Sequence, residues 1–194
     1  MAVVFEREGA RQIVHTLDEE GLRLLRDCAQ VKEKLEHKPK IRVFGKDAHM
    51  QRSVGFFSDE STGYKYSGQT SKAQLMTPEL RRLLNYVNSR LQSNFNGILV
   101  NHYANGEEYI SKHSDDESGL EPNAGVVALS LGAERKFRIR DKKTNEVVSE
   151  VLTRESEMLQ MVGERFQREY THEIPVEKRV KEERTSFTFR CHKV

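Results

Sequence analysis

The stretch Arg184-Thr-Ser-Phe-Thr-Phe-Arg190 alternates residue by residue over its whole length. Successive side chains of a β-strand point to opposite faces, so this stretch has one polar and one more apolar face. The polar face carries Arg184, Ser186, Thr188 and Arg190; the other carries Thr185, Phe187 and Phe189. Two arginines on a strand with an apolar reverse indicate a polar cavity inside a sheet fold. An edge strand with its arginines in water fits the same alternation.

The chain before this stretch contains a series of short strand patterns. From residue 96 onward, apolar runs of strand length are separated by turn residues, with no helical pattern between them. These segments are 96–103, 109–113, 126–131, 136–140, 147–152, 158–162 and 170–174. Together with 184–190 they make eight short strands, which predict an antiparallel jelly roll.

The first half of the chain carries helical signals. Residues 17–36 read as a helix with Asp18 as its N-cap, and a second helix begins with Thr77 as N-cap and Pro78 at its first position. Two short strands are predicted at 41–46 and 51–57. We therefore expect a mainly β protein with flanking helices, of the α+β class. The length of 194 residues suits a single domain, 1–194.

Composition restricts the environment more than the function. Hydrophobic residues make up 36% of the chain and charged residues 32%, which is typical of a polar globular protein. The net charge of +2 neither requires nor forbids a nucleic-acid partner. The two cysteines, Cys28 and Cys191, form no disulfide framework, so we expect a reducing intracellular compartment, the nucleus or the cytoplasm. No apolar run approaches the length of a membrane span, and we expect no membrane partner.

The triplet His113-Ser114-Asp115 suggests a metal site. With 7 histidines and 30 acidic residues, about one His-x-acid triplet is expected by chance, and a surface turn fits this one equally well. On a strand, however, His113 and Asp115 share a face and can bind one ion. Two imidazoles and one carboxylate, completed here by His172, form the ligand set of non-haem Fe(II) oxygenases.

Several motifs in order resemble one enzyme family. They are Asn101-His-Tyr103, His113-Ser-Asp-Asp-Glu117, His172-Glu-Ile-Pro-Val-Glu-Lys-Arg-Val180 and Arg184-Thr-Ser-Phe-Thr-Phe-Arg190. Their order and spacing resemble the AlkB family of Fe(II)- and 2-oxoglutarate-dependent nucleic-acid dealkylases, over roughly residues 40–190. Val43-Phe-Gly-Lys46 and Tyr64-Lys-Tyr-Ser-Gly68 are similar to the eukaryotic branch that repairs double-stranded DNA. The resemblance implies a double-stranded β-helix, with N-terminal helices and a nucleotide-recognition lid in about 1–95 and the jelly-roll catalytic core in 96–194.

The resemblance also implies roles for individual residues. His113, Asp115 and His172 would bind Fe(II), and Arg184 would hold the far carboxylate of the co-substrate 2-oxoglutarate. Arg190 would lie near the end of 2-oxoglutarate that chelates the metal, and Asn101, Tyr103 and Thr188 would donate hydrogen bonds to it. Ser186 departs from the asparagine usual in the family, which we expect to weaken local order without removing activity.

Substrate contacts follow from the same resemblance. A base inside a duplex must be flipped out before it can react, and it then needs an aromatic face on which to stack. Tyr66 would stack on the base opposite His113, while Tyr64 and Glu117 would contact its polar edge. Two further residues match family positions on the substrate side: Phe44, as a finger inserted into the duplex, and Arg135, near the substrate.

The implied activity is oxidative removal of methyl groups from nucleic-acid bases, with 2-oxoglutarate and dioxygen consumed. DNA repair of 1-methyladenine and 3-methylcytosine is the first hypothesis, for a monomer acting on methylated DNA. A demethylase of RNA or single strands, including N6-methyladenine, is the second. An oxygenase acting on protein and a catalytically inactive jelly-roll module that binds nucleic acid are further alternatives. The aromatic lid argues against the protein substrate, and the complete ligand set argues against the inactive module.

Overall fold

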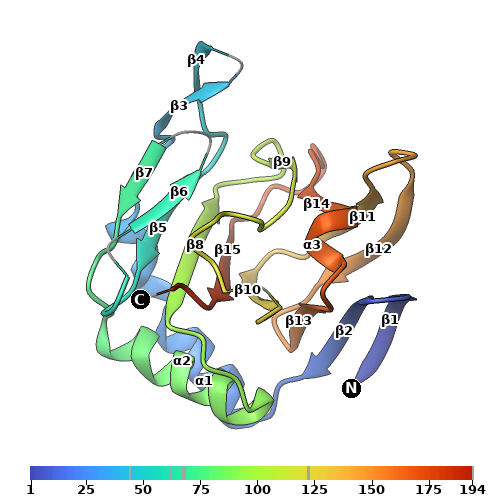
Figure 1. The fold of residues 1–194 in the computed structure, drawn as a ribbon. Coiled ribbons are helices and arrows are strands. Elements are labelled where there is room, and N and C mark those ends of the chain that lie inside the picture. Colours follow the sequence, from blue (N-terminus) through green and yellow to red (C-terminus); the bar gives the residue numbers. More distant parts are fainter. Residues whose placement is uncertain (44, 62, 67–68, 122, 194) are drawn as a thin grey trace.

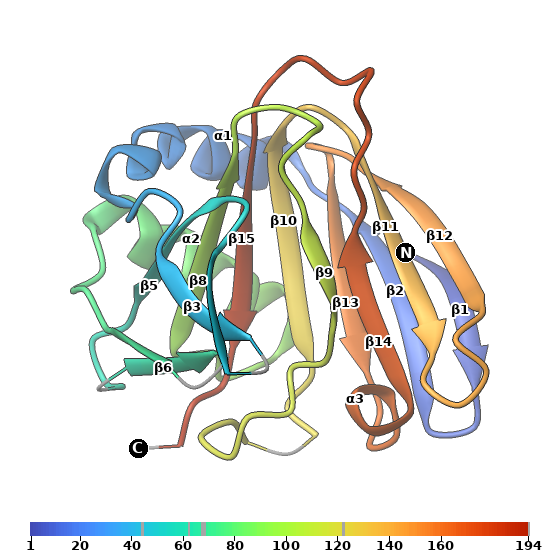
Figure 2. The ribbon, with the colours of Figure 1, turned by 90° about the horizontal axis from the view of Figure 1, so that it is seen from above.

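The strands form two antiparallel sheets that lie face to face (Figure 2). The computed structural model describes residues 1–43, 45–61, 63–66, 69–121 and 123–193, and only the backbone at 43, 64–66 and 69–71. The seven-stranded sheet has the order β1 (Ala2–Arg7), β2 (Ala10–Thr16), β13 (Glu157–Val162), β10 (Val126–Gly132), β15 (Arg184–Arg190), β8 (Gly97–Tyr103), β5 (Ser53–Phe57). The four-stranded sheet has the order β12 (Val147–Thr153), β11 (Arg135–Asp141), β14 (Tyr170–Ile174), β9 (Ile110–His113).

This arrangement confirms the predicted jelly roll and all eight strands from residue 96 onward. The strand with two arginines, β15, lies inside the large sheet between β10 and β8. Arg184 and Arg190 are each only 2% exposed. The alternative of an edge strand with its arginines in water is therefore wrong, and the polar face of β15 lines the space between the sheets.

The outer face of the large sheet packs against two helices, α1 (Glu19–Asp27) and α2 (Pro78–Leu91) (Figure 1). Phe187 and Phe189 of β15 are fully buried there, in one cluster with Leu80 and Val87 of α2. Burying a phenylalanine side chain stabilises a fold by about 1.5–3 kcal/mol. The apolar face of β15 thus packs against the helices, so its two arginines face inward.

Both helices begin as their sequences predict. Asp18 accepts a hydrogen bond from the Gly21 amide, and Thr77 accepts one from the Leu80 amide, so both N-caps are confirmed. The first helix is shorter than predicted: α1 ends at Asp27, and residues 29–34 form a separate 3₁₀ helix, η1 (Ala29–Lys34). The tighter winding already starts at Cys28, whose amide bonds to Leu25 three residues back.

The N-terminal half contributes more to the sheets than the sequence indicated. β1 and β2 extend the large sheet at one edge and β5 at the other, so three of its strands come from residues before 96. The strand predicted at 41–46 is a hairpin, β3 (Lys40–Val43) and β4 (Lys46–His49). A second hairpin, β6 (Gly63–Tyr66) and β7 (Gln69–Lys72), lies near it, and the first projects from the body in Figure 1.

A single helical turn, α3 (Phe166–Glu169), precedes β14 and lies at the same end of the sheets as the loop that follows β9 (Figure 2). None of the helices in the described ranges has both the length and the apolar character needed to cross a bilayer.

Candidate active site

Two strands of the small sheet bring the predicted metal ligands together. His113, the last residue of β9, is the register partner of His172 in β14, and their ring centroids are 4.3 Å apart. Asp115 follows two residues after His113. Its oxygens lie 3.9 Å from His113 Nε2 and 3.4 Å from His172 Nε2. Two ligand atoms on one ion lie up to about 4 Å apart at bond lengths of about 2.0–2.2 Å, so these separations suit a shared ion.

The protonation of the histidines also suits a metal. The Nδ1–H of His113 donates to the Ser111 carbonyl at 2.9 Å, which leaves its Nε2 lone pair directed toward Asp115. Burial lowers the pKa of His113 to about 3, and the neighbouring His172 acts in the same direction. Burial likewise lowers the pKa of His172 to about 3, with Arg190 contributing. Both rings are therefore neutral near pH 7, as metal ligands must be.

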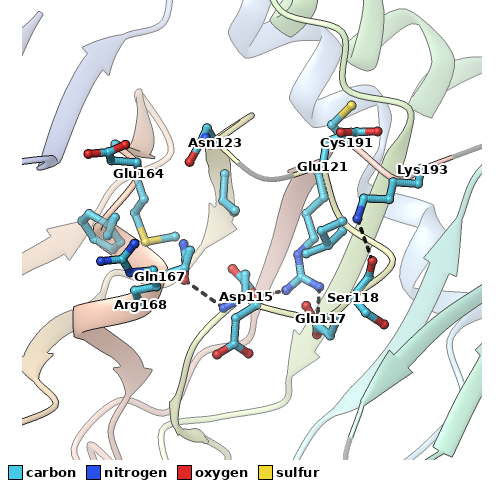
Figure 3. A pocket seen from close by; sticks show the side chains of 18 residues that line it. Asp115, Glu117, Ser118, Glu121, Asn123, Glu164, Gln167, Arg168, Cys191 and Lys193 are labelled. Carbon is cyan, nitrogen blue, oxygen red and sulfur yellow. Dashed lines mark hydrogen bonds and ion pairs between the residues drawn. The ribbon is translucent and has the colours of Figure 1, made fainter.

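The carboxylate of Asp115 is held in place from two sides. Its side chain is fully buried, and Arg190 Nη2 donates to Oδ1. The backbone amide of Asp115 donates to Gln167 Oε1 of α3 at 2.8 Å (Figure 3). Oδ2 has no hydrogen-bond partner in the described part of the chain. A buried carboxylate oxygen without such a partner is costly, and a cation between the two histidines would compensate it. The donor set thus fits a metal.

Arg184 lies at the other end of β15 and faces the same interior. Its Nη2 donates to Ser130 Oγ at 2.8 Å, and its guanidinium carbon is 5.3 Å from the centre of the Tyr103 ring. Nε and Nη1 make no hydrogen bond to the residues that the structure describes. Burial lowers the pKa of Arg184 to about 10, so the group stays charged. A buried cation with two unused donors suits the bidentate binding of an anion such as a carboxylate.

A narrow cavity between the two sheets links these two ends. The predicted co-substrate residues all line it: Asn101, Tyr103, Arg184, Thr188 and Arg190, together with Ser186, His113 and His172. Ser186 is the register partner of Asn101, and Arg184 that of Tyr103. The cavity therefore has the candidate metal ligands at one end. At the other end it has the Arg184 guanidinium, two of whose donors make no hydrogen bond to the described residues, and this arrangement suits a short dicarboxylate.

One residue of this region, Arg52, is not indicated by any motif in the sequence. Arg52 immediately precedes β5 and is 3% exposed, and its Nε donates to Asn101 Oδ1 at 2.6 Å. Because a guanidinium only donates, this bond fixes the amide so that Asn101 Nδ2 is the donor left for other partners. The only sequence signal is a cation directly before an apolar strand, and that signal is common on protein surfaces.

The predicted substrate contacts are less complete. The Glu117 carboxylate lies 3.8 Å from Arg190 Nη1, beside the metal group. Glu117 also lines a second cavity, which is formed by the loop after β9, by α3 and by residues 190–193 (Figure 3). Phe44 lies outside the described residues, and so do the side chains of Tyr64 and Tyr66, whose backbone forms β6.

The resemblance implies that Arg135 lies near the substrate. In the structure Arg135 is completely buried, and its donors bind the protein itself. Nε donates to Glu177 at 3.1 Å, and Nη2 donates to the carbonyls of Glu108 at 3.0 Å and Pro175 at 2.6 Å. Arg135 thus joins the loops that follow β8 and β14. Its hydrogen bonds are explained without a substrate.

Two histidines and one carboxylate placed in this way inside a jelly roll are the ligand set typical of non-haem Fe(II) oxygenases. The family model of the 2OG-Fe(II) oxygenase superfamily matches residues 5–190. The chain belongs to this superfamily and, within it, to the AlkB family. Membership implies Fe(II) as the metal, with 2-oxoglutarate and dioxygen as co-substrates.

Two relatives agree with this family, and a solved structure shares the fold. The chain is 33% identical to the DNA oxidative demethylase ALKBH2 of Mus musculus over 159 residues, which cover 78% of the chain and 66% of that protein. It is 31% identical to the Homo sapiens ALKBH2 over 159 residues, covering 78% and 60%. The chain thus spans less than two thirds of these relatives. The structure of OsALKBH1 has the same fold, with a TM-score of 0.56 at 14% identity, covering 98% of this chain and 100% of that one.

Proposed function

We propose that the chain is a demethylase that removes N-methyl groups from bases in DNA, using Fe(II), 2-oxoglutarate and dioxygen. The observation that carries this proposal is the buried group of His113, Asp115 and His172 at one end of the arginine-lined cavity. The choice of DNA rests on relatives whose name is DNA oxidative demethylase. Lesions of the 1-methyladenine and 3-methylcytosine type are the proposed substrates.

In this proposal the protein residues bind, orient and exclude water. His113, Asp115 and His172 hold the metal, which supplies the oxidising chemistry when 2-oxoglutarate and dioxygen are present. Arg184 binds the far carboxylate through its unused donors, and Asn101, Tyr103 and Thr188 line the path between. Arg190 holds Asp115 in position by donating to Oδ1. The methyl carbon is hydroxylated and leaves as formaldehyde, while 2-oxoglutarate becomes succinate and carbon dioxide.

Base binding is proposed for the mouth of this cavity. A flipped base would stack between His113 and Tyr66, with Tyr64 and Glu117 at its polar edge. Phe44 would fill the gap that the base leaves in a duplex, as apolar wedges do. Residues 1–194 would form one catalytic domain that acts as a monomer, in the nucleus or the cytoplasm where DNA is found.

The test is a panel of oligonucleotides that carry one methylated base. Single- and double-stranded DNA and RNA of the same sequence are incubated with the protein, Fe(II) and 2-oxoglutarate, and methyl loss is followed by mass spectrometry. We expect methylated DNA to be repaired, and Phe44→Ala to slow repair of the duplex more than repair of the single strand. Repair confined to RNA would favour the RNA demethylase, and no methyl loss from any member would contradict the proposal.

A further inference from the structure

Residues 191–193, which follow β15, pair with the loop that follows Asp115. We call residues 116–121 the mouth loop and residues 191–193 the tail. The Glu121 amide donates to the Cys191 carbonyl at 2.8 Å, and the Lys193 amide donates to the Gly119 carbonyl at 2.8 Å. Between these bonds, Leu120 and His192 form an antiparallel bridge. The tail therefore continues β15 as a short piece of ladder with the mouth loop as its partner.

The tail is anchored on its other side to the body of the protein. The His192 amide donates to Asn96 Oδ1 at 2.7 Å, and Asn96 Nδ2 donates to the His192 carbonyl at 2.9 Å. The His192 side chain is 5% exposed, with its ring 4.7 Å from that of Phe56. It packs directly over Gly97, where a Cβ would come within 2.7 Å of His192 Cδ2. The tail thus has a fixed position set by buried contacts.

The mouth loop carries the residues that follow Asp115 in the site. Glu117 lies in it, with its carboxylate 3.8 Å from Arg190 Nη1. The loop also forms one wall of the cavity in Figure 3, where Lys193 Nζ donates to the Ser118 carbonyl at 3.1 Å. No helix or strand of the described chain includes residues 116–121. One backbone bond within the loop, from the Leu120 amide to the Glu117 carbonyl, and the bonds from the tail hold them.

We propose that the tail is a positioning element that holds the mouth loop, and Glu117 with it, in the geometry that receives the nucleic-acid substrate. This inference rests on the proposed function and deepens it, because it assigns substrate positioning to residues outside the ligand and cavity motifs. The same strand that carries Arg184 and Arg190 toward 2-oxoglutarate continues into the element that shapes the substrate side. The contacts that do this are mainly backbone hydrogen bonds, so they depend little on the side chains of Cys191 and Lys193.

Proline at position 193 separates the backbone contact from the side chain. Lys193→Pro removes the amide that donates to Gly119, and the preceding residue, His192, already has the extended backbone that proline favours. Lys193→Ala is the matched control, because it keeps that amide and removes only the side-chain contact of Nζ with the Ser118 carbonyl. Hydrogen exchange of peptides covering 117–121 reports on the loop directly, and steady-state kinetics with a methylated oligonucleotide report on the substrate.

In Lys193→Pro we expect the amide hydrogens of the mouth loop to exchange faster than in the wild type. The KM for the oligonucleotide should rise about three- to tenfold, which corresponds to the loss of one backbone hydrogen bond. The KM for 2-oxoglutarate and the melting temperature should stay unchanged in Lys193→Pro. Lys193→Ala, which loses only the exposed Nζ contact with Ser118, should change mouth-loop exchange and the oligonucleotide KM much less than Lys193→Pro does. The proposal would be overturned if the mouth-loop amides of Lys193→Pro exchanged at the wild-type rate, or if they exchanged faster while the oligonucleotide KM stayed unchanged. An equal rise of the KM for the oligonucleotide and of the KM for 2-oxoglutarate would also overturn it. Wild-type inactivity on every oligonucleotide would instead overturn the proposed function, while the exchange data would still show whether the tail holds the loop.

Discussion

His113 and His172 are register partners on adjacent antiparallel strands, and their rings lie 4.3 Å apart. Their relative position is therefore set by the backbone ladder between β9 and β14. Phe137 of β11 supports the pair from the next strand, with its ring stacked on that of His172 at 5.4 Å. Asp115, which lies beyond the strand end, is held instead by Arg190 and Gln167. Backbone pairing and side-chain contacts thus set the relative positions of the three residues.

Replacing any proposed ligand should remove the metal. We expect His113→Ala, Asp115→Ala and His172→Ala each to weaken Fe(II) or Co(II) binding by more than about 100-fold, since losing a mere supporting partner costs about 10–100-fold. Titration followed by Co(II) absorption measures this. Asp116→Asn is the matched control, because Asp116 is an exposed neighbouring carboxylate outside the ligand group. Tight binding that persists in a ligand variant would exclude that residue from the metal site.

Arg184→Ala should mainly weaken 2-oxoglutarate binding. The lost bidentate contact to a buried carboxylate corresponds to roughly 2–5 kcal/mol, and it should appear as a higher KM for 2-oxoglutarate. Arg184→Lys should recover little, because an ammonium group cannot reproduce the planar pair of donors. Steady-state rates of 2-oxoglutarate turnover measure both variants. A 2-oxoglutarate dependence equal to that of the wild type would place the far carboxylate elsewhere.

Arg52 and Asn101 should act as one unit. Arg52→Ala frees the Asn101 amide to rotate, so we expect it to raise the KM for 2-oxoglutarate, as Asn101→Ala does. The double variant should be no worse than the more affected single variant, because both changes remove the same oriented donor. Melting temperatures of the three variants control for unfolding. Independent, additive effects would show that Arg52 does not work through Asn101.

The metal-free protein should lose stability in mild acid. In the folded state the pKa of both His113 and His172 is about 3, below their ordinary 6.5, so the unfolded chain takes up protons first. The stability from these neutral rings is fully present above pH 6.5 and is lost as the pH falls toward 3. At pH 5 we expect a loss on the order of 2 kcal/mol for each histidine.

Chemical denaturation in the presence of a chelator measures this pH dependence. His172→Ala should reduce the fall in the free energy of unfolding between pH 7 and pH 5, because it removes one of the two titrating rings. A free energy of unfolding that stays level over this range in the wild type would mean that the histidines titrate in the folded protein as they do in water.

The sequence predicts those parts of the fold that depend on local pattern. The eight strands from residue 96 and the caps Asp18 and Thr77 are confirmed, because alternation and capping act over a few residues. β1 was missed because it is an edge strand with one buried residue, Phe5, so its sequence hardly alternates. Arg52 and the internal hydrogen bonds of Arg135 were not predicted, because the partners of both arginine side chains lie 27 to 49 residues away along the chain.

The most direct test of the whole account is the coupling between methyl removal and 2-oxoglutarate turnover. A DNA duplex with a single 1-methyladenine is incubated with the protein, Fe(II), 2-oxoglutarate and air, and the base, succinate and formaldehyde are quantified together. We expect one succinate and one formaldehyde for each methyl group removed, and no methyl loss with Asp115→Ala or with a chelator. Succinate formed without any change in the base, or methyl loss that survives the chelator, would contradict the account.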